Sequence, residues 1–174
     1  MNRVGDNLCV VYGIWLEESF ALSVVALGSA TTVIGVAELM GEGLTATVAD
    51  RLGLKRATFT GLVCSSLSYA LLPLLGQSLP LALAGLFLTF ITFEFSVVTS
   101  FSLFTEVLPK ARASMMSSLL AAAGIGRVIG ALVGGPIWFT GGMMAVGLVS
   151  TAVSTLALAC LWWGLKGWQA QPGS

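Results

Sequence analysis

The chain has 174 residues, of which 56% are hydrophobic and only 9% are charged, and its mean hydropathy is +0.95. A soluble domain carries about a quarter charged residues, so this composition excludes a water-soluble globular protein and indicates one embedded in a membrane. Eight basic and eight acidic residues give a formal net charge of zero, which supplies no electrostatic reason to expect a nucleic-acid partner.

The predicted elements are α-helices, and a helix needs about 20 apolar residues to cross a bilayer. The first apolar run, residues 8–16, is too short and predicts a truncated helix that covers about half of the bilayer. Five full spans follow it, at residues 21–48, 57–75, 79–104, 114–138 and 143–165. The predicted fold class is therefore an all-α membrane protein, a bundle of five full transmembrane helices plus a truncated N-terminal helix.

The connections between these spans are short, as expected for neighbouring antiparallel helices. We therefore expect a single transmembrane domain over residues 1–174. Its parts are a truncated helix and outer loop at 1–20, the five-span bundle at 21–165 and a cytoplasmic tail at 166–174.

Basic residues near the span ends predict the orientation, because cytoplasmic loops carry an excess of Lys and Arg. Six of them fall on one side of the predicted membrane: Arg51, Lys55, Arg56, Lys110, Arg112 and Lys166. Glu17 and Glu18 fall on the other side. Tryptophans are expected at both boundaries, Trp15 and Trp138 outside and Trp162, Trp163 and Trp168 inside. We expect a multi-pass protein of the plasma membrane with a cytoplasmic C-terminus.

The sequence offers little to metal, cofactor or covalent chemistry. It contains no histidine, and its three cysteines, Cys9, Cys64 and Cys160, lie far apart. Zinc sites, disulfide frameworks and Cys–His catalysis need clustered residues of these types. No nucleophile–base pair is apparent, so we expect no metal, no cofactor and no enzymatic activity.

Charged residues inside the spans are candidates for function, because a charge in a bilayer is costly. At about 1.5 Å per residue, Glu38, Glu94 and Arg127 lie roughly 15–20 Å from the cytoplasmic boundary, near the midplane. A carboxylate in a low-dielectric pocket can exchange a proton near neutral pH, which predicts a site for substrate or coupling protons. The alternative is a structural ion pair between Glu94 and Arg127. Glu42, one turn nearer the cytoplasm, is assigned to a cytoplasmic gate.

A glycine series marks the fourth full span. Gly126, Gly130 and Gly134 recur at every fourth position and form one stripe along a helix, which lets a neighbouring backbone approach closely. Pro136 follows a Gly-Gly pair and indicates a bend or a packing seam at the outer end of the span. Generic helix packing is the alternative to a functional role.

The connection at residues 48–56 reads Val-Ala-Asp-Arg-Leu-Gly-Leu-Lys-Arg. Its candidate functional residues are Asp50, Arg51, Gly53, Lys55 and Arg56. Charges in this arrangement can bind a neighbouring helix end or an acidic side chain across the inner face, and Glu106 is the expected partner of Arg51 or Arg56. Ordinary positive-inside topology is the alternative explanation.

This connection resembles the signature loop of the major facilitator superfamily of transporters, Gly-x-Leu-Ala-Asp-Arg-x-Gly-Arg-Lys, which recurs in each half of the family's fold. The matching residues are Ala49, Asp50, Arg51, Gly53 and Lys55, and the departures are Ala46, Val48 and Leu54. Residues 130–136 are similar, more loosely, to the family's glycine–proline motif. The resemblance covers residues 10–165. It implies the C-terminal half of a twelve-helix fold, with the truncated helix as the outer end of the seventh helix.

The resemblance implies secondary active transport of a small solute by alternating access, as a half-unit or fragment that lacks the N-terminal half. The charged loop with Glu106 would form the cytoplasmic gate, and Glu38, Glu94 and Arg127 would line or brace the central cavity. The implied partners are the lipid bilayer, a small-molecule substrate, and an N-terminal half-transporter or a second copy of this chain, with no nucleic acid. The alternative is a non-transporting membrane scaffold or assembly protein, which the position of the signature loop disfavours.

Overall fold

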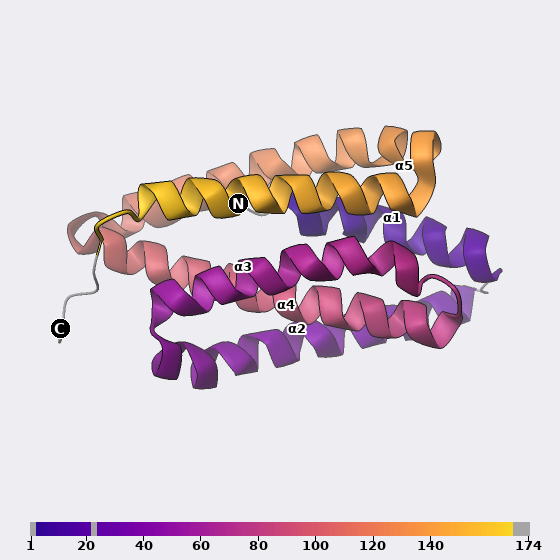
Figure 1. Ribbon diagram of the computed structural model, residues 1–174, viewed down its shortest axis with the longest axis horizontal. Helices are drawn as coiled ribbons and strands as arrows, with labels where there is room; N and C mark the ends of the chain where they lie inside the picture. The colour runs from indigo at the N-terminus through magenta and orange to yellow at the C-terminus, as the bar shows by residue number, and fades with distance from the viewer. Residues whose placement is uncertain (1–2, 22–23, 169–174) are drawn as a thin grey trace.

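The chain is built almost entirely of α-helices that run up and down beside one another (Figure 1). The computed structural model describes the backbone of residues 3–21 and 24–168 and, within these, all side chains except those of residues 3–11, 24–27 and 50. The elements are α1 (Arg3–Phe20), α2 (Val24–Leu52), α3 (Leu54–Leu71), the 3-10 turn η1 (Leu72–Leu75), α4 (Leu79–Val107), the 3-10 turn η2 (Pro109–Ala111) and α5 (Arg112–Gly164).

α5 is bent back on itself. Its 53 residues would extend about 80 Å as a straight helix, more than twice the thickness of a bilayer core. The backbone leaves the helical region at Gly141 and Gly142, where Gly142 has a φ of +57°, and Figure 1 shows the chain reversing near this point. We call residues 112–140 the first limb of α5 and residues 143–164 its second limb.

Four of the described helical segments are long and apolar enough to cross a membrane: Gly28–Ala49, Leu54–Leu75, Leu79–Val107 and Pro109–Gly164. This confirms an all-α membrane fold. The prediction of five separate spans is not confirmed in that form, because the predicted spans 114–138 and 143–165 belong to the single bent segment of α5.

α1 is longer than the truncated helix predicted at residues 8–16. It has 18 residues, because the polar residues on both sides of the apolar run continue the helix. It is not among the described segments that are apolar enough to cross a membrane. α1 packs chiefly against α5.

The predicted polar loops are much shorter in the structure. α2 continues to Leu52, Gly53 alone interrupts the helix, and α3 begins at Leu54. Gly53 has a φ of +79°, a conformation that residues with a side chain rarely adopt. The connection between the predicted spans 79–104 and 114–138 is also short, since α4 runs to Val107 and a 3-10 turn follows. The charged residues of both connections therefore lie mostly at helix ends.

Three apolar clusters of described residues hold the helices together, and the smallest of them joins Ala49, Ala57 and Phe95. Of the other two, the first includes Trp15, Phe90 and Trp138, and the second is centred on Leu103 and Leu161. Trp15 and Trp138, which were expected at the outer boundary, are both buried, at 4% and 8% exposure, and pack between helices.

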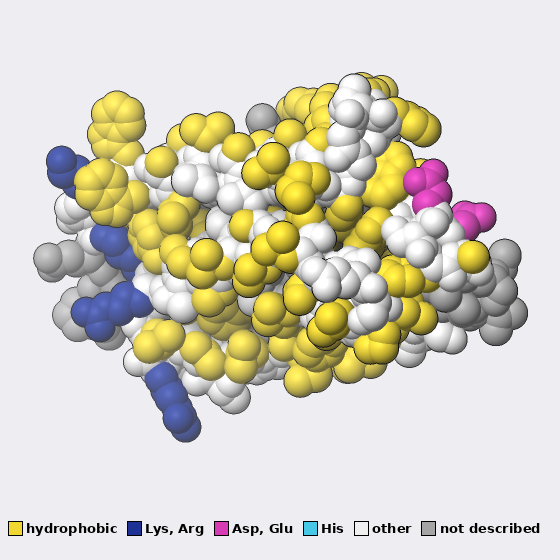
Figure 2. Space-filling model, turned by 45° about the vertical axis from the view of Figure 1, so that its right-hand side comes forward, with side chains coloured by type: hydrophobic (Ala, Val, Ile, Leu, Met, Phe, Trp, Pro, Cys, Tyr) yellow, Lys and Arg dark blue, Asp and Glu magenta, His cyan; other side chains and the backbone are white. Residues whose placement is uncertain are grey.

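Charge is segregated between the two ends of the molecule. Figure 2 shows Lys and Arg side chains at one end, acidic side chains at the other and a mainly hydrophobic surface between them. The basic end combines the α2–α3 junction, the α4–α5 connection and the end of α5. The described surface in this view thus has a basic end and an acidic end, separated by a mainly hydrophobic region.

Candidate functional site

α2 and α4 cross at very short range, and Gly41 makes this approach possible. A Cβ atom at Gly41 would lie 2.8 Å from the carbonyl oxygen of Ile91 and 2.9 Å from the Cβ of Glu94, both on α4. Only a residue without a side chain fits there, as at other close helix crossings in membranes. Sequence reasoning missed Gly41, although its place between Glu38 and Glu42 was a usable signal.

This crossing brings three carboxylates together. Glu38 and Glu42 lie one turn apart on α2, and both are close enough to Glu94 on α4 for their charges to act on it. Glu38 and Glu94 are partly buried, whereas Glu42 is exposed. The structure thus places Glu38 beside Glu94, as their depths suggested, and adds Glu42, which we had assigned to the gate. We call these three residues the carboxylate cluster.

Arg127 comes from a different helix than these carboxylates. It lies on the first limb of α5 with an exposed side chain. The ion pair between Glu94 and Arg127 that the sequence suggests stays a prediction.

α4 has a second close crossing, with α3, and this one carries no charge. A Cβ atom at Gly61 would lie 2.8 Å from the Oγ of Ser96 and 2.9 Å from the Cδ1 of Phe95. Hydroxyl groups line the contact, and Thr92 donates from Oγ1 to the Oγ of Ser68 at 3.4 Å. Both hydroxyls also donate to carbonyls of their own helices, at 2.8 and 2.9 Å. This crossing is therefore satisfied by neutral groups alone.

The carboxylate cluster needs a polar environment. Its members lie inside the apolar segments Gly28–Ala49 and Leu79–Val107, at membrane depth. A charged side chain that faces lipid at this depth is costly, so such residues face a water-filled cavity or another protein surface. Among the described residues, no group of three or more His, Cys, Asp or Glu side chains is arranged to hold a metal ion.

Polar groups continue along α2 towards the acidic end of the molecule. The hydroxyl of Tyr12 on α1 lies 3.1 Å from the Oγ1 of Thr31 on α2, and the Tyr12 ring meets Phe90 on α4 edge-on, with centroids 6.4 Å apart. A hollow of about 450 Å³ between α2 and α4 is lined in part by Ser29 and Thr32. Sequence reasoning missed these residues, because uncharged polar side chains are common in membrane helices.

The signature loop lies at the basic end and is anchored by Lys55. Lys55 donates from Nζ to the carbonyl oxygens of Leu165, at 2.8 Å, and of Trp168, at 3.0 Å. The start of α3 is thereby linked to the end of α5. A cation at the C-terminal end of a helix also interacts favourably with the helix dipole.

The other charged side chains predicted for the gate are exposed where the structure describes them. Arg51, Arg56 and Glu106 are exposed, and among the side chains that the structure describes no ion pair joins Glu106 to either arginine. The side chain of Asp50 lies outside the described residues. Gly53 makes the break between the two helices, as described above.

The glycine stripe lies on the buried face of the first limb of α5. Gly126, Gly130 and Gly134 are all buried, and α1 is the helix that packs most extensively on α5. Pro136 is exposed and the helix continues through it. The chain reverses at Gly141 and Gly142, in the gap between the predicted spans 114–138 and 143–165.

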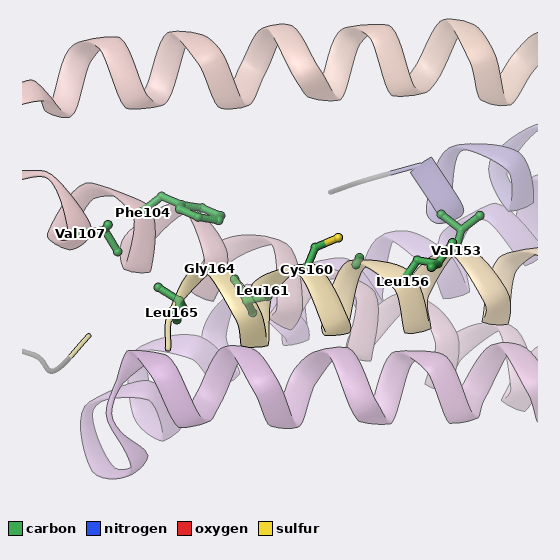
Figure 3. Close-up of a pocket in the computed structure, with 9 residues that line it drawn as sticks. Phe104, Val107, Val153, Leu156, Cys160, Leu161, Gly164 and Leu165 are labelled. Carbon is green, nitrogen blue, oxygen red and sulfur yellow. The ribbon is translucent and has the colours of Figure 1, made fainter. Parts of the chain in front are cut away.

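A separate apolar groove of about 530 Å³ runs between the end of α4 and the second limb of α5. Figure 3 shows Phe104 on α4 and Cys160 on the second limb extending into it. No charged residue and none of the predicted site residues of the described chain lines this groove. It is therefore distinct from the carboxylate cluster.

Comparison with known proteins identifies the family. The profile of the Major Facilitator Superfamily matches residues 4–172. The uncharacterized MFS-type transporter YceJ of Bacillus subtilis (strain 168) is 29% identical over 123 residues, which cover 71% of this chain and 31% of that protein. The uncharacterized MFS-type transporter YwfA of the same organism is 26% identical over 144 residues, or 83% of this chain and 35% of that protein.

The chain thus spans about a third of the length of the curated relatives it matches. No solved structure gives a significant match. The family profile covers nearly the whole sequence, and it agrees with the helical bundle and with the signature residues around Gly53. The chain belongs to the major facilitator superfamily.

Proposed function

We propose that this chain is a half-unit of a secondary active transporter that moves a small solute across the plasma membrane by alternating access. Its family and its similarity to MFS-type transporters support transport in general. The observation that carries the proposal is the carboxylate cluster at the α2–α4 crossing. The α3–α4 crossing is equally close and contains only neutral groups, so packing against α4 does not require carboxylates. We therefore attribute the cluster to function.

The cluster is suited to coupling solute movement to protons. Like charges at short range repel, and uptake of a proton by one carboxylate removes part of that repulsion. Protonation therefore changes the charge of the α2–α4 face, and with it the preference of that face for water or for a closed, dry interface. Glu94 and Glu38, which are partly buried, are the proposed proton-exchanging residues, and the exposed Glu42 is their connection to the cavity.

The α2–α4 face is the proposed wall of the solute cavity. Transporters of this architecture bind substrate between two halves near the bilayer midplane. The exposure of Glu42 and the hollow beside Ser29 and Thr32 support a position against such a cavity. The proposed partner is an N-terminal half-transporter that supplies the other wall, with a second copy of this chain as the alternative. In this arrangement Arg127, exposed on the first limb of α5, faces the cavity and braces it.

The basic end is the proposed cytoplasmic gate. Arg51 and Arg56 lie at the two helix ends that Gly53 separates, and Glu106 lies near the end of α4. We propose that these charges, with Asp50, form contacts when the cytoplasmic side closes and lose them when it opens. The described side chains of Arg51, Arg56 and Glu106 are exposed and form no ion pair with one another, and we assign this arrangement to an open gate.

The proposal is tested by reconstitution. The chain would be placed in liposomes with pyranine inside, alone and together with the N-terminal half of YceJ. Proton movement would be recorded on addition of sugars, amino acids and organic cations in turn. We expect proton movement with at least one solute in the paired system, and its loss when Glu94→Gln is introduced. The matched control is Ser68→Ala. Ser68 lies on α3 at the neutral α3–α4 crossing, and its replacement should leave proton movement intact.

Two outcomes would count against the proposal. Proton movement that is equal in Glu94→Gln and in the unmodified chain would remove the coupling role of the cluster. Absence of any solute-dependent movement in every pairing would favour a membrane scaffold over a transporter.

A further inference from the structure

A pocket of about 590 Å³ lies at the basic end, where α3 begins and α5 ends. Its volume is in the range of about 300–1,000 Å³ that small-molecule sites occupy. Two cations, Lys55 and Arg56, line it together with the aromatic side chains of Phe59, Trp162 and Trp168. The pocket thus combines positive charge with a large apolar wall, and it is separate from the carboxylate cluster.

The structure fixes the position of one of these cations. The Lys55 ammonium group donates to the carbonyl oxygens of Leu165 and Trp168, at 2.8 and 3.0 Å. The chain turns at Gly167, which has a φ of +84°, and this turn brings Trp168 to the pocket. An ammonium group has three donors, and the two carbonyls use two of them. Lys55 is therefore held in place with one donor left for a further acceptor.

The charges around the pocket favour an anion. Arg56 is exposed and has five N–H donors in a planar fork that suits a phosphate group. The first turn of α3 lies beside it without a side-chain cap, which adds to the positive potential. Among the described acidic side chains, the one at this end is Glu106, which is exposed on α4 and does not line the pocket.

The apolar wall favours a lipid over a soluble anion. Trp162 is 64% exposed and Trp168 is partly buried, and tryptophans at this level of a membrane protein lie among lipid headgroups. A soluble phosphate has no apolar part that could contact aromatic side chains. The glycerol and upper acyl chains of a phospholipid can make such contacts. Basic pockets between membrane helices on the cytoplasmic side bind anionic headgroups.

We propose that this pocket binds an anionic phospholipid. Lys55 and Arg56 contact its phosphate, and Phe59, Trp162 and Trp168 contact its glycerol backbone and the first part of its acyl chains. The pocket shares Arg56 with the proposed gate, but the proposal does not depend on transport, because binding of a phospholipid requires neither the carboxylate cluster nor the movement of a solute.

The test uses the full chain purified in detergent and native mass spectrometry. Dioleoyl phosphatidylglycerol and dioleoyl phosphatidylcholine, which share their acyl chains, would be offered at equal concentration. We expect phosphatidylglycerol to be preferred. Arg56→Gln should reduce this preference about fivefold, the effect of one basic residue at an anionic headgroup. The conservative variant Arg56→Lys should retain most of the preference, which guards against a loss caused by misfolding.

The matched control is Arg112→Gln, which removes the same charge from the same end of the molecule but lies outside the pocket. It should change the preference by less than about twofold, because Arg112 does not line the pocket and a charge outside it is screened by salt. An equal effect of Arg112→Gln and Arg56→Gln, or no preference for phosphatidylglycerol, would overturn the proposal. Displacement of phosphatidylglycerol by excess inorganic phosphate would also overturn it, since the pocket would then be a soluble-anion site.

Discussion

The two crossings of α4 use the same packing device and differ in what surrounds it. Gly41 lets α2 approach α4, and Gly61 lets α3 approach it, with a virtual Cβ contact of 2.8 Å in each case. Around Gly61 the polar groups are hydroxyls that donate to their own helices. Around Gly41 they are three carboxylates, those of Glu38 and Glu42 on α2 and of Glu94 on α4.

The difference separates the needs of packing from those of function. Hydroxyl groups can join membrane helices at little cost, because a Ser or Thr side chain can donate to a carbonyl of its own helix. Carboxylates at membrane depth are costly and are kept where ions or protons move. The α3–α4 crossing therefore shows that two helices of this bundle can pack closely with neutral polar groups alone. The carboxylates at the α2–α4 crossing are not needed for such packing.

Gly41→Ala should cause the largest loss of stability at these crossings. The added Cβ would meet the Ile91 carbonyl and the Glu94 Cβ, which the α4 backbone holds in place, so α2 must move away. Overpacking of this kind costs about 1–3 kcal/mol, and we expect the upper part of that range. The free energy of unfolding in mixed micelles measures it. Gly43→Ala, where an added Cβ has nothing within 4 Å, is the control and should cost little.

Gly61→Ala should cost less, about 1 kcal/mol. The two nearest atoms to its added Cβ belong to the side chains of Ser96 and Phe95, which can rotate, and the Ser96 Cα lies further away at 3.2 Å. The same unfolding measurement applies. A loss equal to that of Gly41→Ala would mean that the two crossings are equally rigid, which removes the basis for ranking them.

Ser68→Ala should have the smallest effect, below about 1 kcal/mol. Thr92 loses the Ser68 oxygen as an acceptor but keeps its bond to the Leu88 carbonyl, at 2.8 Å, so no polar group is left unsatisfied. Unfolding in mixed micelles again provides the measurement. A loss as large as that of Gly61→Ala would show that the hydroxyl contact, rather than the glycine, holds α3 to α4.

The helices were predictable because each apolar run is a local pattern. The predicted span 79–104 lies within α4, whose observed end at Val107 adds only three residues to the prediction. The connections were less predictable, since a helix can continue past the membrane into charged residues. α2 therefore runs to Leu52, and a single glycine replaces the predicted loop. The predicted spans 114–138 and 143–165 leave a turn of four residues, 139–142. In the structure α5 reverses within this turn, and the residues that leave the helical conformation are Gly141 and Gly142.

The candidate site was predictable only in part. Glu38 and Glu94 were found because a charge stands out in an apolar run. Depth along a helix, however, gives the level of a residue and not the direction in which it points. For this reason the pairing of Arg127 with Glu94 stays a prediction, and Gly41 was missed, because its role depends on which helix faces it.

The most direct test of the central claim is the stability of a variant that combines Glu38→Gln, Glu42→Gln and Glu94→Gln. These changes keep the shape of the side chains and remove their charge. The thermal midpoint of the full chain in detergent would be compared with that of the unmodified chain and of Gly41→Ala. If the carboxylates serve function, the midpoint stays the same or rises, because a costly group of like charges has been removed. A fall as large as that caused by Gly41→Ala would show that the cluster holds the helices together, and would contradict the account.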